Sequence, residues 1–120
     1  MAAIFQSRRF APEDADKFEL DSCLFVDCLF DRYQMDSTHL SESSFVECEF
    51  RRVSMYWKLM YSAKFLKCVF TDVDFRGANM TEAVFVKCKF TRCDFSTDSL
   101  GGSTDLSVVE FIDCERHECK

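Results

Sequence analysis

The sequence repeats one string at intervals of 20 residues: FVDCLF at 25–30, FVECEF at 45–50, FLKCVF at 65–70 and FVKCKF at 85–90. A shorter step runs through and between the copies, because every fifth residue from Leu20 to Leu100 is Leu, Met or Phe. A step of five fits neither the 3.6-residue period of a helix nor the two-residue period of a strand. The pattern therefore indicates an internal repeat, in which four steps of five make one four-sided coil.

Such a repeat is typical of a solenoid, where residues 20 apart lie above one another in successive coils. Each coil buries its large apolar residues only by stacking on its neighbours, so the core is one continuous column. The pattern predicts about four coils, with a core made mostly of phenylalanine: Phe25, Phe45, Phe65, Phe85, Phe30, Phe50, Phe70 and Phe90.

Several five-residue units share a finer pattern, with a small residue two positions before the large one and often Asp or Asn just before it. Ala78-Asn79-Met80-Thr81-Glu82 shows it, as do Val73-Asp74-Phe75 and Cys93-Asp94-Phe95. In this pattern the chain resembles the pentapeptide-repeat proteins over residues 20–100. The resemblance implies an all-β fold, a right-handed quadrilateral β-helix. It does not fix the function, because one fold serves many functions.

The segments that flank the repeat are expected to cap it, because an open coil exposes strand edges and core. Residues 1–19 are expected to form an N-terminal cap with a short helix that begins near Pro12, which is followed by three acidic residues. Residues 101–120 are expected to form a loop, a last partial coil around Phe111 and a C-terminal cap, because Arg116 occupies the place of a large apolar residue.

The eight cysteines follow the repeat rather than a disulfide framework. Six occupy the small inward position and are expected to be buried, reduced thiols: Cys23, Cys28, Cys48, Cys68, Cys88 and Cys93. The alternative is a metal site formed by Cys114, His117 and Cys119 with Cys93, but this spacing fits no strong zinc pattern. We therefore expect neither a metal nor another cofactor.

The sequence gives no sign of catalysis or of a membrane segment. Two histidines and three glycines offer no nucleophile–base pair at a known spacing and no phosphate-binding loop, so an enzyme is not expected. No apolar run reaches the length of a membrane helix, and residues 1–10 lack the apolar core of a secretory signal. These features predict a cytoplasmic protein without membrane contact.

Acidic residues are concentrated in the early coils, and the formal net charge is −6. An acidic surface repels nucleic acid and attracts basic proteins. Solubility alone is the alternative explanation for these acids. The predicted partner-binding acids are Asp27, Asp31, Asp36, Glu42, Glu47 and Glu49.

Three aromatic residues interrupt the polar outward positions, namely Tyr56, Trp57 and Tyr61. Exposed Trp and Tyr are typical of interface hot spots, so they complete the predicted binding site. The alternative is a local bulge that folds these rings against the rod. An apolar row also stacks at one outward or corner position, as Val26, Val46, Leu66 and Val86. Local packing is the favoured explanation for this row, and an exposed interaction strip is the other.

These features predict a non-catalytic protein-binding module with a basic protein partner. The family resemblance implies two versions of this function. One is an antagonist of the immunity type that neutralises a bacterial toxin such as a basic nuclease, and this is the version we favour. The other is a mimic of duplex DNA that acts on a type II topoisomerase. A passive scaffold or adaptor domain is a third alternative. The chain is expected to be a monomer or a homodimer joined through an end coil.

Overall fold

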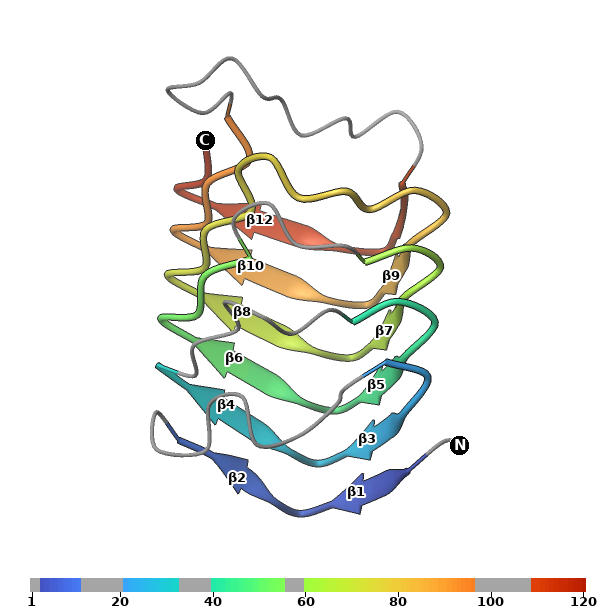
Figure 1. Cartoon of the computed structure of the whole chain (residues 1–120). Helices are drawn as coiled ribbons and strands as arrows, with labels where there is room; N and C mark the ends of the chain where they lie inside the picture. The colour runs from blue at the N-terminus through green and yellow to red at the C-terminus, as the bar shows by residue number, and fades with distance from the viewer. Residues whose placement is uncertain (1–2, 12–20, 33–39, 56–59, 97–108) are drawn as a thin grey trace.

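The structure, a computed structural model, describes residues 3–11, 21–32, 40–55, 60–96 and 109–120. In these ranges the chain is a parallel β-solenoid with two six-stranded sheets (Figure 1). The first sheet contains β1 (Ile4–Gln6), β3 (Leu24–Val26), β5 (Ser44–Val46), β7 (Lys64–Leu66), β9 (Val84–Val86) and β11 (Glu110–Ile112). The second sheet contains β2 (Arg9–Phe10), β4 (Leu29–Asp31), β6 (Glu49–Arg51), β8 (Val69–Thr71), β10 (Lys89–Thr91) and β12 (Glu115–His117).

Each coil contributes one strand to each sheet, and we call such a pair of strands a rung. The rungs follow the 20-residue period of the sequence, because Phe25 pairs with Phe45, and Phe45 pairs with Phe65. The last step differs, since Phe111 pairs with Phe85, 26 positions before it. The expected all-β solenoid is therefore confirmed, with its register set by the repeat.

The first rung lies where a cap was expected. Residues 4–10 form β1 and β2, which pair in parallel with β3 and β4. The reason is packing: the Phe5 ring stacks on Phe25 with ring centroids 5.1 Å apart, and Phe10 is fully buried. The helix expected near Pro12 lies outside the described residues.

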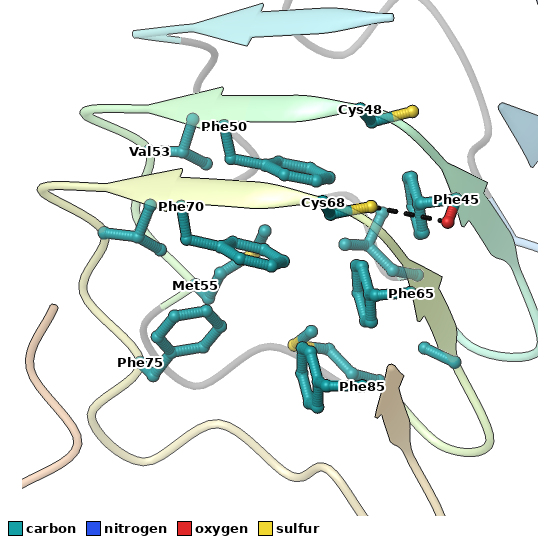
Figure 2. Close-up of a cluster of buried hydrophobic side chains, with 14 of the residues drawn as sticks. Phe45, Cys48, Phe50, Val53, Met55, Phe65, Cys68, Phe70, Phe75 and Phe85 are labelled. Carbon is teal, nitrogen blue, oxygen red and sulfur yellow. Dashed lines mark hydrogen bonds between the residues drawn. The ribbon is translucent and has the colours of Figure 1, made fainter. Parts of the chain in front are cut away.

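Two columns of phenylalanine lie inside the solenoid, one behind each sheet, and Leu40, Met55, Met60, Phe75, Met80 and Phe95 fill the rest of the core (Figure 2). Within a column the rings are stacked, as Phe50 on Phe70 with centroids 4.8 Å apart. Between columns the rings meet edge to face, as Phe65 and Phe70 at 5.4 Å. Both arrangements are favourable for aromatic pairs, so the core gains energy beyond the area that it buries.

The coil turns at corner residues, which we define as the second residue after a large inward one. Among the described residues, fourteen such corners are not glycine, and these and Glu118, which follows Arg116, have a positive φ between 51° and 62°. Each corner N–H that faces the next coil donates to a carbonyl there, as Lys67 N to Val86 O at 2.8 Å. The left-handed conformation is costly for residues with a Cβ, and this hydrogen-bond ladder offsets the cost.

The inward cysteines pack as expected. All six are buried, and all eight cysteines of the chain are free thiols. Four of these cysteines stack 20 residues apart: Cys28, Cys48, Cys68 and Cys88. Each of their thiols donates to a carbonyl of the preceding rung, as Cys68 Sγ to Phe45 O at 3.4 Å (Figure 2). A free cysteine therefore serves here as a small apolar residue with a satisfied weak donor.

Candidate protein-binding surface

The outer face of the first sheet carries an apolar strip, formed by the third residue of five successive strands. Its members are in register from β3 to β11: Val26, Val46, Leu66, Val86 and Ile112. Leu66 is 39% exposed and Ile112 is 44% exposed, whereas the three valines are half-buried. Local packing alone was the favoured explanation for this row, but Leu66 and Ile112 are exposed in the described structure, which favours the interaction strip at these two positions.

The apolar strip borders a shallow groove. Its wall is almost wholly apolar, and Lys64 and Ser44 stand at its side. The remaining lining comes from the strip and from the strand residues next to it: Phe45, Val46, Phe65, Leu66, Val84 and Val86. An exposed apolar surface of this kind, bordered by polar residues, is typical of a protein interaction site.

A column of charged corner residues runs directly beside the apolar strip. From the early to the late rungs its side chains are Asp27, Glu47, Lys67, Lys87 and Asp113, with φ of 54° or 55° at each. The sign of charge therefore changes between Glu47 and Lys67. The expected polarity of the rod is present along this corner as two acids followed by two bases.

Three of the predicted acids are exposed and form no ion pair with another described residue: Asp27, Glu42 and Glu47. Asp27 accepts only a long hydrogen bond from Ser7 Oγ, at 3.3 Å. Glu42 and Glu47 both lie in the third coil, at two different corners. These three carboxylates are available to an external cation.

Asp31 differs from the expectation of an exposed acid, because it is 8% exposed and fully paired. Arg52 Nη2 donates to its carboxylate at 2.7 Å, and an Arg9 nitrogen lies 3.5 Å away. Burial raises the pKa of Asp31, but the Arg52 hydrogen bond and the nearby arginine charges outweigh it, so the pKa is lowered. Its charge is already neutralised within the chain and offers little to a partner.

Glu49 is also paired, but at the surface. Arg51 Nε donates to its carboxylate at 2.7 Å, and both side chains are more than 40% exposed. Such a pair contributes little to stability and can exchange partners. Glu49 is therefore less available to a partner than the unpaired acids are, but more available than Asp31.

Only one residue of the predicted aromatic patch lies within the described ranges. Tyr61 is 40% exposed, and its hydroxyl accepts a hydrogen bond from Asn79 Nδ2 at 3.2 Å. Its carbonyl accepts the Glu42 N–H at 2.7 Å, so Tyr61 lies beside one of the unpaired acids. Tyr56, Trp57 and Asp36 lie outside the described residues.

The sequence reasoning missed that an arginine covers each end of the aromatic core. The Arg8 guanidinium lies 5.9 Å from the Phe5 ring and 5.3 Å from Phe10. Arg116 lies over Phe111 at 5.3 Å and over Phe95 at 6.0 Å. The signal was present at Arg116, which stands where the repeat requires a large apolar residue.

The alternative metal cluster does not assemble in the structure. Cys114 and Cys119 donate to backbone carbonyls, whereas His117 Nε2 lies 3.5 Å from the Glu115 carboxylate. Within the described ranges, no three or more His, Cys, Asp or Glu side chains are grouped so as to hold a metal ion. The same ranges contain no helix that is long and apolar enough to span a membrane.

Comparison with known proteins places the repeat in a family. A family model of pentapeptide repeats matches residues 60–96 with eight copies. No curated protein matches the chain.

Two solved structures are similar to the chain in fold. A trypsin-treated QnrB1, described as a plasmid-mediated fluoroquinolone resistance protein, aligns with a TM-score of 0.53 at 15% identity. That alignment covers 79% of this chain and 48% of QnrB1, so the chain spans about half of that protein's length. The pentapeptide repeat protein Rfr23 of the cyanobacterium Cyanothece 51142 aligns with a TM-score of 0.49 at 10% identity, over 98% and 84% of the two chains.

At these identities the likeness to QnrB1 shows the fold alone. The match of the family model adds the repeat itself, and the rungs carry the same five-residue step on both sides of the matched segment. Residues 60–96 match the pentapeptide-repeat family model, and the described part of the chain folds as a parallel β-solenoid.

Proposed function

We propose that the protein is a non-catalytic binding module that antagonises a basic protein partner, held on the early coils beside the apolar strip. The observation that carries the proposal is the position of the unpaired carboxylates Asp27 and Glu47. Each directly follows a strip residue, Val26 or Val46, and borders the exposed side of the first sheet.

This arrangement suits the two physical requirements of a protein interface. Apolar area that becomes buried supplies affinity, and charges at its border steer the partner and select its sign. An unpaired carboxylate costs less to engage than a paired one, because no internal ion pair has to be broken first. Tyr61, exposed beside Glu42, adds an aromatic contact to the same coils.

A basic nuclease toxin is the partner class that we favour, with the chain acting as its immunity-type inhibitor. The support is chemical and comes from the charge: a protein that binds nucleic acid presents basic residues, which the acidic early coils would attract. The same coils repel phosphate, so direct binding of nucleic acid is not part of the proposal. The immunity role itself rests on the family resemblance of the sequence.

A mimic of duplex DNA is the second candidate, and the structure offers it less support. Six rungs at about 4.8 Å span roughly 24 Å between the first and last strands, or about seven base pairs. In addition, arginines neutralise acids on the second sheet, as Arg52 does for Asp31 and Arg92 for Asp72. A mimic of the phosphate backbone requires a longer and more uniform row of unpaired acids.

The test is a pull-down from native lysate with the wild-type chain and with Glu47→Lys. Lysine is compatible with this corner, because Lys67 and Lys87 occupy the equivalent corner in the next two rungs. Their φ is 54° and 55°, and that of Glu47 is 54°. The variant should therefore fold normally and change only the charge. Glu82→Lys is the matched control, since Glu82 is an exposed corner residue of a late coil.

We expect wild type and Glu82→Lys to capture one stoichiometric basic protein and to inhibit its activity. Glu47→Lys should capture at least tenfold less, and about 0.5 M salt should weaken the complex because it screens exposed charges. Equal capture by all three chains would move the interface away from the early coils. Capture without inhibition would favour a scaffold.

A further inference from the structure

We propose that the last rung carries a redox site, in which peroxide links Cys114 to Cys88 and Cys119 to Cys93. Each of these pairs joins the last rung to the rung beneath it. The two disulfides would fasten the C-terminal rung to the solenoid. This inference is independent of the proposed function.

Backbone contacts place the cysteines of each pair in neighbouring positions of adjacent rungs. The residue after Cys114, Glu115, donates its N–H to the Cys88 carbonyl at 3.0 Å. Lys120 likewise donates to the Cys93 carbonyl at 3.0 Å. Neighbouring parallel strands are about 4.8 Å apart, which lies within the Cα separation of a disulfide.

The side chains of the two pairs also meet. The Cys93 N–H donates to Cys119 Sγ at 3.4 Å, so that sulfur lies directly against the backbone of its proposed partner. The Cys114 and Cys88 thiols make equivalent contacts, each donating to the carbonyl of a phenylalanine in the preceding rung. Bond formation requires a rotation of the thiols and a small approach of the last rung.

Exposure and packing select these pairs from the other stacked cysteines. Cys48 and Cys68 are at most 1% exposed, and a coil on each side fixes their separation. Cys114 and Cys119 are partly exposed, and they flank β12, an edge strand that pairs with β10 alone among the described strands. Peroxide can therefore reach these two thiols, and an edge rung can approach its neighbour more easily than an interior rung can.

The chemistry is ordinary thiol oxidation with hydrogen peroxide as the oxidant. The thiolate of Cys114 or Cys119 attacks one peroxide oxygen, the O–O bond breaks, and sulfenic acid and hydroxide form. The partner thiol loses its proton to hydroxide, attacks the sulfenic sulfur and expels a second hydroxide, which is protonated to water. In sum, two thiols and one peroxide give one disulfide and two waters.

Burial raises the pKa of the Cys114 thiol, and it raises the pKa of Cys93 to about 12. These thiols are therefore protonated at neutral pH, and the reaction should accelerate as the pH rises toward 9. The site is a slow responder to sustained peroxide rather than a fast peroxidase.

The experiment treats the full reduced chain with hydrogen peroxide, blocks the remaining thiols with N-ethylmaleimide in denaturant, and maps linked peptides by mass spectrometry. Trypsin with chymotrypsin separates Cys93 from Cys114, because Phe95 and Phe111 lie between them. We expect Cys88–Cys114 and Cys93–Cys119 links, an intact mass before alkylation that is lower by about 2 Da per disulfide, and a higher Tm for the oxidised chain.

The variants are Cys114→Ala with Cys119→Ala, and Cys48→Ala with Cys68→Ala as the matched control. Alanine fits these small positions, as Ala63 and Ala83 do elsewhere in the core. The first pair should abolish the links and the rise in Tm, and the control should keep both. Links among interior cysteines, links between chains, or only alkylated and overoxidised thiols in the wild type would overturn the proposal.

Discussion

At the scale of single residues, the corners of the coil show a tension between conformation and sequence. Fifteen non-glycine residues adopt a left-handed conformation that is costly for any residue with a Cβ. Their side chains nevertheless point outward, so the repeat leaves their chemistry unrestricted. This freedom allows Asp, Glu, Lys, Arg and Ser to share one backbone geometry, and the surface charge can be varied without changing the coil.

We predict opposite effects of glycine at two exposed lysines of the same coil. Lys67→Gly should stabilise the protein by about 0.5 kcal/mol, because relief at the positive φ exceeds the entropy that glycine adds to the unfolded chain. Lys64→Gly, in β7, should destabilise it by about 1 kcal/mol, because a strand gains nothing from glycine. Urea denaturation measures both. A loss of stability at both positions would contradict the argument about the corner.

At the scale of elements, the strands are held by the columns of rings behind them. Phe70 in β8 stacks between Phe50 and Phe90, with centroids 4.8 and 4.9 Å away. Phe111 in β11 stacks on one described ring, that of Phe85 at 5.2 Å, and is only partly buried. The contribution of a rung to stability therefore depends on whether it has neighbours on both sides.

Phe70→Ala is expected to cost about 3–5 kcal/mol, as for a large aromatic residue in a closed core. Phe111→Ala should cost less than half as much, since Phe111 is only partly buried and loses less apolar area when truncated. Thermal and urea denaturation of the two variants provide the comparison. Equal losses in the free energy of unfolding would contradict this prediction, because every ring would then contribute the same amount whatever its position in the column.

The repeat in the sequence was sufficient to predict the strands but not the ion pairs between them. Rungs follow from the 20-residue spacing of Phe25, Phe45 and Phe65, because only stacking buries those rings. Asp27 and Asp31 occupy different positions of the repeat, a corner and the end of a strand, but neither position shows in the sequence whether the acid is paired. Asp31 is buried because Arg52, one coil later, folds over it, and such a choice of side-chain conformation leaves no mark in a periodic pattern.

The first rung was missed for a related reason. Phe5 lies on the five-residue grid, but its flanking residues do not follow the finer repeat pattern. The Phe5 ring stacks on the Phe25 ring and extends the sheet, although the residues beside Phe5 depart from the repeat. The sequence was sufficient to name the surface acids. The structure was needed to separate the unpaired acids Asp27, Glu42 and Glu47 from the paired acids Asp31 and Glu49.

At the scale of the whole molecule, the two ends of the solenoid determine whether copies remain separate. Each end presents an edge strand of both sheets, which can pair with another chain. The guanidinium groups of Arg8 and Arg116 lie over the end rings and place a hydrated charge there. A charged side chain beside an edge strand disfavours pairing with another chain.

We predict that Arg8→Ala with Arg116→Ala promotes end-to-end association of the chain. Sedimentation velocity over a range of protein concentrations should show larger species for the double variant than for wild type. Arg92→Ala is the control, because Arg92 lies on the side of the solenoid in an exposed pair with Asp72. Association of wild type to the same extent would mean that the arginines do not protect the ends.

The direction of the hydrogen bonds between rungs also has a mechanical consequence. β1 and β12 lie at opposite ends of the solenoid, and the bonds between strands run along its long axis (Figure 1). A force applied to the two termini therefore pulls on one rung at a time, as in a zipper, and does not shear many bonds together. Each released coil of 20 residues would lengthen the chain by about 60 Å. The solenoid should therefore yield stepwise under tension.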